Sequence, residues 1–170
     1  MFSTIPDLSF HGEHIATFHE FTFGRYPYYK KYNASLPINE VHGVLNTTIK
    51  DHLEVEEFDI TNRTDENFSG LGIIHFEEWR PLFDQNDWKE KQVFLNQSIA
   101  LVWERNSTTG NETLIKNLAI EEFNEDAKDF FLKTIKLAKK LRPKAKWGFY
   151  GFPYCNYNAG RNGEYECDQK

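Results

Sequence analysis

The sequence predicts an α/β fold in which short parallel strands alternate with longer covering helices. Segments rich in β-branched and aromatic residues recur along the chain, and segments with apolar residues at helical spacing lie between them. Glycine or proline stands at several of the boundaries. Since a strand–helix–strand progression implies parallel strands joined by right-handed crossovers, we expect a parallel sheet with helices packed on it.

The first half of the chain contributes one strand and one helix to this prediction. Residues 15–21 are rich in β-forming residues and predict a strand. Residues 26–37 contain two prolines and predict an irregular surface loop. Residues 41–58 carry apolar residues at helical spacing and predict a helix that covers the sheet. The polar residues 59–67 predict a loop.

The second half of the chain contributes two helices. Residues 87–104 begin with Asp-Trp-Lys-Glu, which reads as a capping box, and continue with a stripe expected to be buried: Leu95, Ile99, Val102 and Trp103. Residues 113–141 form the longest predicted helix, with acidic residues ahead of basic ones, as the helix dipole favours. The basic end of this helix is either a glycan contact or, as we favour, a solvated terminus.

Residues with ionisable side chains lie at the ends of the two remaining predicted strands. The apolar residues 71–76 predict a buried strand, and alternation then places His75 and Glu77 on one face at its carboxyl end. Residues 147–152 predict another strand, with Tyr150 near the same rim. Catalytic groups cluster at this end of parallel strands. Ordinary surface charges and a rim aromatic with a satisfied hydroxyl are the alternatives.

Three blocks of the chain resemble the hyaluronidase family of glycoside hydrolases. Residues 68–83 are similar to its catalytic-strand segment, F-x-G-[LV]-[AG]-V-I-D-[WF]-E-x-W-R-P. Residues 142–157 are similar to R-P-x-A-x-W-G-[FY]-Y-[GA]-[FY]-P-x-C-[YF]-N, and residues 15–29 more weakly to a segment ending in L-G-x-Y-P-Y-Y. The resemblance implies a partial (β/α) barrel of the TIM type, with roughly three parallel strands and covering helices. It also implies that residues 1–170 are one partial catalytic domain lacking the family's first strand and C-terminal half.

The resemblance also assigns roles to four residues. Glu77 matches the proton donor, and Tyr150 matches the tyrosine beside the acetamido group of the substrate. His75 stands where the family has an aspartate, and His19 where it has a tyrosine. The implied reaction is substrate-assisted, retaining hydrolysis of β-1,4 N-acetylhexosaminide bonds in a glycosaminoglycan, hyaluronan or chondroitin, with no cofactor and no metal.

The histidine at position 75 leaves the activity open. Neutral imidazole brings no negative charge, and a protonated imidazole places a cation beside a developing cation. Loss of one preorganised electrostatic group slows catalysis about 10²–10³-fold. The alternatives are therefore an active hydrolase, an inactive secreted glycoprotein that at most binds glycosaminoglycan, and a truncated chain that does not fold stably.

Sequons and cysteines indicate the secretory pathway. Asn-x-Ser/Thr occurs at Asn33, Asn46, Asn62, Asn67, Asn96, Asn106 and Asn111. Cys155 and Cys167 are spaced for a disulfide, and the family resemblance supports that bridge; two free thiols are the alternative, while two cysteines do not make a zinc site. No signal peptide is visible in the first residues. We expect a secreted or lysosomal location.

Composition and charge argue against three further classes. The chain has 170 residues, of which 39% are hydrophobic and 16% aromatic, enough for one domain and too apolar for a disordered segment. The formal net charge of −6 argues against a nucleic-acid partner, which selects a basic face. No run of about 18 apolar residues is present, so we expect no membrane span.

Overall fold

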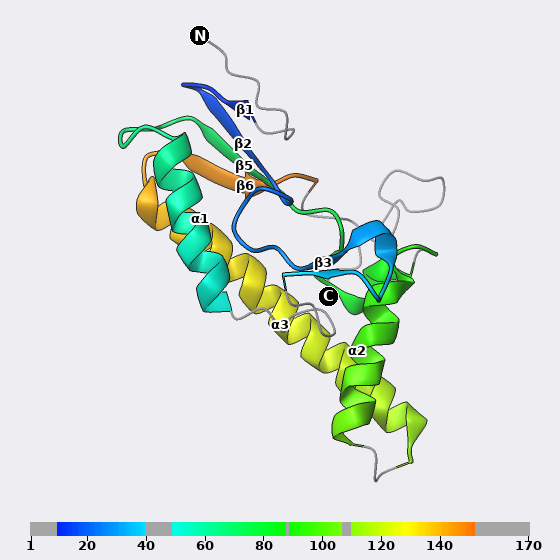
Figure 1. Cartoon of the computed structure of the whole chain (residues 1–170). Coiled ribbons are helices and arrows are strands. Elements are labelled where there is room, and N and C mark those ends of the chain that lie inside the picture. Colours follow the sequence, from blue (N-terminus) through cyan, green and yellow to red (C-terminus); the bar gives the residue numbers. More distant parts are fainter. Residues whose placement is uncertain (1–9, 40–48, 88, 107–109, 152–170) are drawn as a thin grey trace, which may run out of the picture.

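The main sheet contains the predicted parallel strands. The computed structural model describes residues 10–39, 49–87, 89–106 and 110–151 (Figure 1). In these residues the sheet has the order β1-β2-β5-β6. Its strands are Phe10–His11 (β1), Ile15–His19 (β2), Leu71–His75 (β5) and Lys146–Phe149 (β6). β2, β5 and β6 run parallel, as predicted, and β1 adds an antiparallel partner to β2.

The helices pack along this sheet and against one another. They are Ile49–Arg63 (α1), Gln92–Arg105 (α2) and Glu112–Leu141 (α3). Figure 1 shows α1 beside the C-terminal half of α3 and α2 beside its N-terminal half. None of the helices in the described part of the chain is long and apolar enough to cross a membrane.

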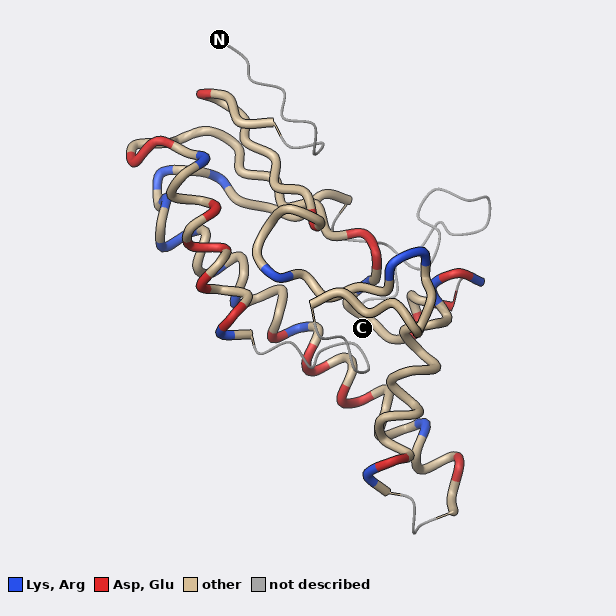
Figure 2. The backbone as a smooth tube through the Cα atoms, viewed as in Figure 1, with Lys and Arg blue, Asp and Glu red and all other residues tan. Residues whose placement is uncertain are grey.

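The long helix confirms the prediction for residues 113–141 within one residue. It is capped by Asn111, whose side chain accepts a hydrogen bond from the Leu114 N–H at 3.1 Å. Acidic residues precede basic ones along it (Figure 2). The basic C-terminal end of α3 leads into the amino end of β6. The basic residues therefore lie away from the carboxyl edge of the sheet, which supports a solvated helix terminus rather than a glycan contact.

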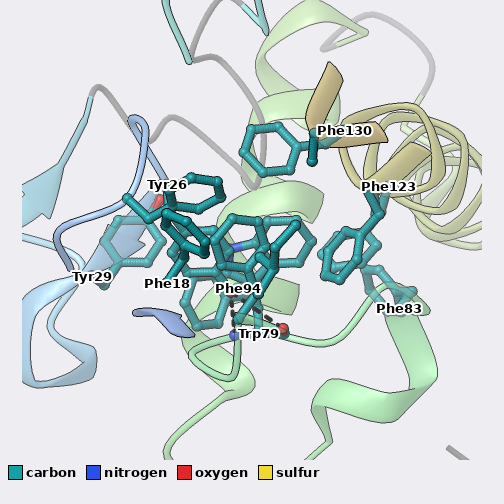
Figure 3. Packing of buried hydrophobic residues seen from close by; sticks show 14 of the residues in the cluster. Phe18, Tyr26, Tyr29, Trp79, Phe83, Phe94, Phe123 and Phe130 are labelled. Carbon is teal, nitrogen blue, oxygen red and sulfur yellow. Dashed lines mark hydrogen bonds between the residues drawn. The ribbon is translucent and has the colours of Figure 1, made fainter. Parts of the chain in front are cut away.

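Aromatic side chains fill the core between the sheet and the helices (Figure 3). The Trp79 ring is fully buried and lies parallel to the Tyr26 ring, with centroids 5.2 Å apart. Tyr26 also stacks on Phe76 at 4.3 Å, and Trp79 meets Phe130 edge to face at 5.9 Å. Burying each such side chain contributes about 1.5–3 kcal/mol.

Residues 26–37 are more ordered than the predicted surface loop. Tyr28–Tyr29 (β3) pairs antiparallel with Pro37–Ile38 (β4), and a short 3₁₀ turn, Lys30–Tyr32, lies between them. Tyr26 and Tyr29 are buried in the core. The prediction was wrong here because the two prolines mark the hairpin's edges while the tyrosines supply tertiary contacts.

The boundaries of α1 differ from the prediction. The expected loop at 59–67 is helical as far as Arg63, while residues 41–48 lie outside the described part of the chain. Two side chains stabilise this last turn. Arg63 pairs with Asp59 one turn earlier at 3.0 Å and donates to the Thr22 carbonyl at 2.8 Å. The second contact spans 41 residues of sequence.

The expected capping box of α2 is also wrong. The helix begins at Gln92, and Lys91 precedes it without a side-chain cap. Asp87 instead ends a 3₁₀ turn, Phe83–Asn86. Of the expected stripe, Val102 is buried but Trp103 is 40% exposed, whereas Phe94 is fully buried. The predicted strands end earlier than expected, at His19, His75 and Phe149.

Candidate active site

The parallel register brings the predicted site residues to one edge of the sheet. His19 on β2 and His75 on β5 are register partners at the carboxyl ends of their strands, with ring centroids 5.0 Å apart. Tyr150 follows β6, where its N–H donates to the Ile74 carbonyl at 2.8 Å. Its ring lies 4.5 Å from that of His75. Three strands thus contribute to one cluster.

Glu77 completes the cluster at the exposed edge. Its Oε2 lies 2.8 Å from Nε2 of His75, so the two form an ion pair whenever the imidazole is protonated. The Glu77 side chain is 45% exposed, and Tyr150 is 52% exposed. His19 is buried at 7% exposure. A ligand in solution therefore reaches Glu77 and Tyr150 directly, whereas His19 supports His75 from within.

A buried carboxylate holds the turn that carries Glu77. Oε2 of Glu20 accepts hydrogen bonds from the backbone N–H groups of Glu77 and Glu78, the latter at 3.0 Å. Burial raises the pKa of Glu20 to about 7, although these two N–H donors favour the ionised form. Glu20 was not predicted as a site residue; its only signal in the sequence was an acidic residue at the end of a predicted strand.

Three further side chains, from Lys91, Glu78 and Tyr32, lie at this turn. Lys91 donates from Nζ to the backbone carbonyl of Glu77, and burial, followed by the nearby charge of Arg80, lowers the pKa of Lys91. Burial raises the pKa of Glu78, whose carboxylate is hydrogen-bonded to the Tyr32 hydroxyl. Burial of the Tyr32 hydroxyl, followed by the charge of Glu78, raises the pKa of Tyr32 to about 12. The Glu77 backbone is therefore held from both its N–H and its C=O.

The predicted modification sites are spread over the chain. Asparagines 33, 62, 67, 96 and 111 are exposed in the structure. Asn106 is half-buried, and its Nδ2 donates to the Val102 carbonyl at 2.9 Å. Asn46, Cys155 and Cys167 lie outside the described residues, so the disulfide stays a prediction.

Glutamate, imidazole and phenol groups at the carboxyl edge of parallel strands define the class of protein. This is the arrangement of (β/α)-barrel enzymes, in which the strand ends present the reacting groups. The described strands form an open four-stranded sheet, which is consistent with a segment of such a barrel.

Comparisons with known proteins identify the family. A family model described as hyaluronidase matches residues 1–169. The chain is 34% identical over 157 residues to a chondroitin hydrolase of Caenorhabditis elegans, covering 92% of this chain and 34% of the relative. It is 41% identical over 126 residues to a hyaluronidase of Polistes annularis, covering 74% of this chain and 33% of that protein. This chain belongs to the hyaluronidase family of glycoside hydrolases.

The structural comparison agrees with this assignment. The crystal structure of bee venom hyaluronidase in complex with a hyaluronic acid tetramer is similar, with a TM-score of 0.75 and 32% identity. The match covers 86% of this chain and 44% of that structure. The chain spans about a third of the length of the two relatives and less than half of the solved structure.

Proposed function

We propose that this chain carries the catalytic edge of a glycoside hydrolase that cleaves β-1,4 N-acetylhexosaminide bonds in hyaluronan or chondroitin. The observation that carries the proposal is the position of Glu77, half-exposed at the end of β5 with Tyr150 on the neighbouring strand end. The bee structure holds a hyaluronic acid tetramer, and one relative is named a chondroitin hydrolase, which supports a glycosaminoglycan substrate. Residues 1–170 then act as one partial catalytic domain.

The proposed mechanism needs one carboxyl group and the substrate's own acetamido group. The acetamido oxygen attacks the anomeric carbon while Glu77 gives its proton to the leaving glycosidic oxygen. Tyr150 donates its hydroxyl hydrogen bond to the acetamido group. Water then opens the cyclic intermediate, and Glu77 takes back a proton, so the anomeric configuration is retained.

The contact between His75 and Glu77 favours a second candidate function. The imidazole of His75 lies 2.8 Å from the proposed proton donor and in neither protonation state supplies negative charge for the cationic intermediate. In this alternative the chain binds glycosaminoglycan without turning it over. His19 behind His75 adds a further imidazole and no carboxylate.

The secretory pathway is part of the proposal. Five of the sequon asparagines are exposed in the structure, where an oligosaccharide can be attached without unpacking the core. A bridge between Cys155 and Cys167 would suit the same oxidising compartment.

Variants at positions 75 and 77 separate the two functions. We expect His75→Asp to raise hydrolysis of hyaluronan about 10²–10³-fold, because it restores a negative charge beside the intermediate. Glu77→Gln in either background abolishes turnover, since the amide has no proton to give. Reducing-end assays between pH 3.5 and 7 measure both effects.

Glu57→Gln is the matched control, since Glu57 is an exposed glutamate on α1. Its turnover should equal that of the unchanged chain. Hydrolysis that persists in Glu77→Gln would disprove the assignment of the proton donor. Binding of hyaluronan without turnover, even after His75→Asp, would support the binding function instead.

A further inference from the structure

Beyond the proposed catalytic residues, an exposed aromatic ring extends the edge of the sheet. Phe21 comes two residues after the end of β2 and is 50% exposed. Its ring centroid lies 5.0 Å from that of His19 and 4.8 Å from that of Tyr28. Its backbone N–H also lies 3.5 Å from Nδ1 of His19. Phe21 is therefore held by neighbours while one side of its ring faces solvent.

Together these rings form a continuous row from the hairpin to β6. Each ring lies 4.5–5.0 Å from the next along the row Tyr28, Phe21, His19, His75 and Tyr150. The proposed catalytic groups occupy one end of the row, and Phe21 and Tyr28 occupy the other. The carboxylates of Glu78 and Glu20 act on Tyr28 at this end of the row. Burial, followed by the charges of Glu78 and Glu20, raises the pKa of Tyr28.

An aromatic surface with a few polar neighbours suits a sugar. The face of an aromatic ring carries partial negative charge, and the C–H groups on one face of a pyranose carry partial positive charge, so the two stack. A ring already fixed by its neighbours loses little conformational entropy when it binds. Exposed aromatic side chains next to a catalytic edge therefore offer a place for sugars beyond the cleaved bond.

We propose that Phe21 and Tyr28 form a sugar-binding subsite that stacks a pyranose ring of the glycosaminoglycan chain on the β2 side of the catalytic edge. This subsite rests on the proposed function, because it extends the same edge of the sheet. It lengthens the stretch of polysaccharide that the chain recognises past the sugars in contact with His75 and Tyr150.

The test is a binding measurement in the Glu77→Gln chain, which cannot consume its ligand. We expect Phe21→Ala to weaken binding of a hyaluronan hexasaccharide about three- to tenfold in calorimetry. Phe21→Tyr should keep the affinity, because it keeps the ring. Binding of a hyaluronan disaccharide should not change, since that ligand does not reach from the catalytic edge to Phe21.

Phe58→Ala is the matched control, because Phe58 is a 67% exposed phenylalanine on α1. The Phe58→Ala variant should bind the hexasaccharide with the same affinity as the parent. Circular dichroism verifies that each variant folds. Equal hexasaccharide affinity in Phe21→Ala and its parent would overturn the subsite and leave the proposed function intact. A Glu77→Gln chain that binds no hyaluronan at all would overturn both.

Discussion

Glu20 shows how a single residue can act on the site without facing the substrate. Its carboxylate accepts from the N–H groups of Glu77 and Glu78, and so fixes the backbone on which the proposed proton donor stands. The acid is buried and its pKa is raised to about 7, so its charge changes near neutral pH. A charge-assisted hydrogen bond is about twice as strong as a neutral one. The turn is therefore held more firmly once Glu20 ionises.

We predict that the amide resonances of Glu77 and Glu78 titrate together, with a midpoint near pH 7. As the pH rises through the pKa of Glu20, both N–H protons should move downfield, because they then bond to a charged acceptor. Two-dimensional ¹⁵N spectra recorded from pH 5 to 8.5 measure this. Glu20→Gln should abolish the shared titration, and Glu57→Gln should preserve it. Unchanged titration in Glu20→Gln would assign it to another group.

Among the secondary-structure elements, Arg142 joins the end of α3 to the end of α1. The side chain is 6% exposed, and its Nη2 donates to the carbonyl of Thr64 at 2.9 Å and of Thr61 at 3.4 Å. Thr61 lies in the last turn of α1 and Thr64 directly follows it, at a helix end that a cation stabilises through the helix dipole. The contact sets how α1 and α3 meet just before β6 begins.

We predict that Arg142→Ala lowers the free energy of unfolding by about 1.5–3 kcal/mol, because two part-buried carbonyls lose a charged donor. Arg142→Lys should lose less than Arg142→Ala, since a single ammonium group replaces part of the fork of donors. Urea unfolding followed by circular dichroism measures both. Lys140→Ala, an exposed neighbour at the same helix end, should change stability by no more than about 0.5 kcal/mol. A loss in Lys140→Ala equal to that in Arg142→Ala would contradict this role.

Across the whole molecule, stability depends on ionisable groups buried between α1 and the core. His52 is fully buried; its Nδ1 accepts from the Arg25 N–H at 3.0 Å, and its Nε2 lies 3.0 Å from the Thr134 hydroxyl. Burial lowers the pKa of His52 to about 3. Burial, followed by the charge of Asp59, raises the pKa of Glu56 from 4.5 to about 9. Both side chains therefore favour their neutral forms in the folded chain.

The two groups act on stability with opposite signs. A lowered histidine pKa makes the folded state more stable as the pH rises from about 3 to 6.5. A raised glutamate pKa makes it less stable as the pH rises from 4.5 to about 9. Glu20 acts like Glu56, but only as far as about pH 7. Between pH 7 and 9 the contribution of Glu56 is therefore the one that remains of these three.

We predict that the melting temperature of the chain falls between pH 7 and 9, and that Glu56→Gln removes most of the fall. The unfolded state releases the Glu56 proton while the folded state retains it, at up to about 1.4 kcal/mol per pH unit. Thermal melts by circular dichroism at pH 7, 8 and 9 measure the slope, with Glu57→Gln as the exposed control. Parallel pH slopes in the parent and in Glu56→Gln would contradict the prediction. A melt without a cooperative transition would instead support the third alternative from the sequence, a truncated chain that does not fold stably.

Local patterns made much of the fold and the core of the site predictable. Strand alternation placed His75 and Glu77 at one strand end, and the acidic residues ahead of basic ones over residues 113–141 marked α3. The capping box at Asp87 misled because the signal is local, whereas α2 begins where Phe94 packs into the core. The end of α1 was missed for a similar reason, since Arg63 stabilises it through Thr22, 41 residues away.

The sequence by itself determined the order of the parallel strands β2, β5 and β6 and of the three helices between them, and the family motifs that carry Glu77 and Tyr150. These features follow from periodicity and from residues close together in the chain. Only the tertiary structure decided that Glu20 holds the Glu77 turn and that Phe21 meets Tyr28. The physical reason is that such contacts join side chains from separate elements, and their geometry exists only once the strands have taken their register and the helices have packed.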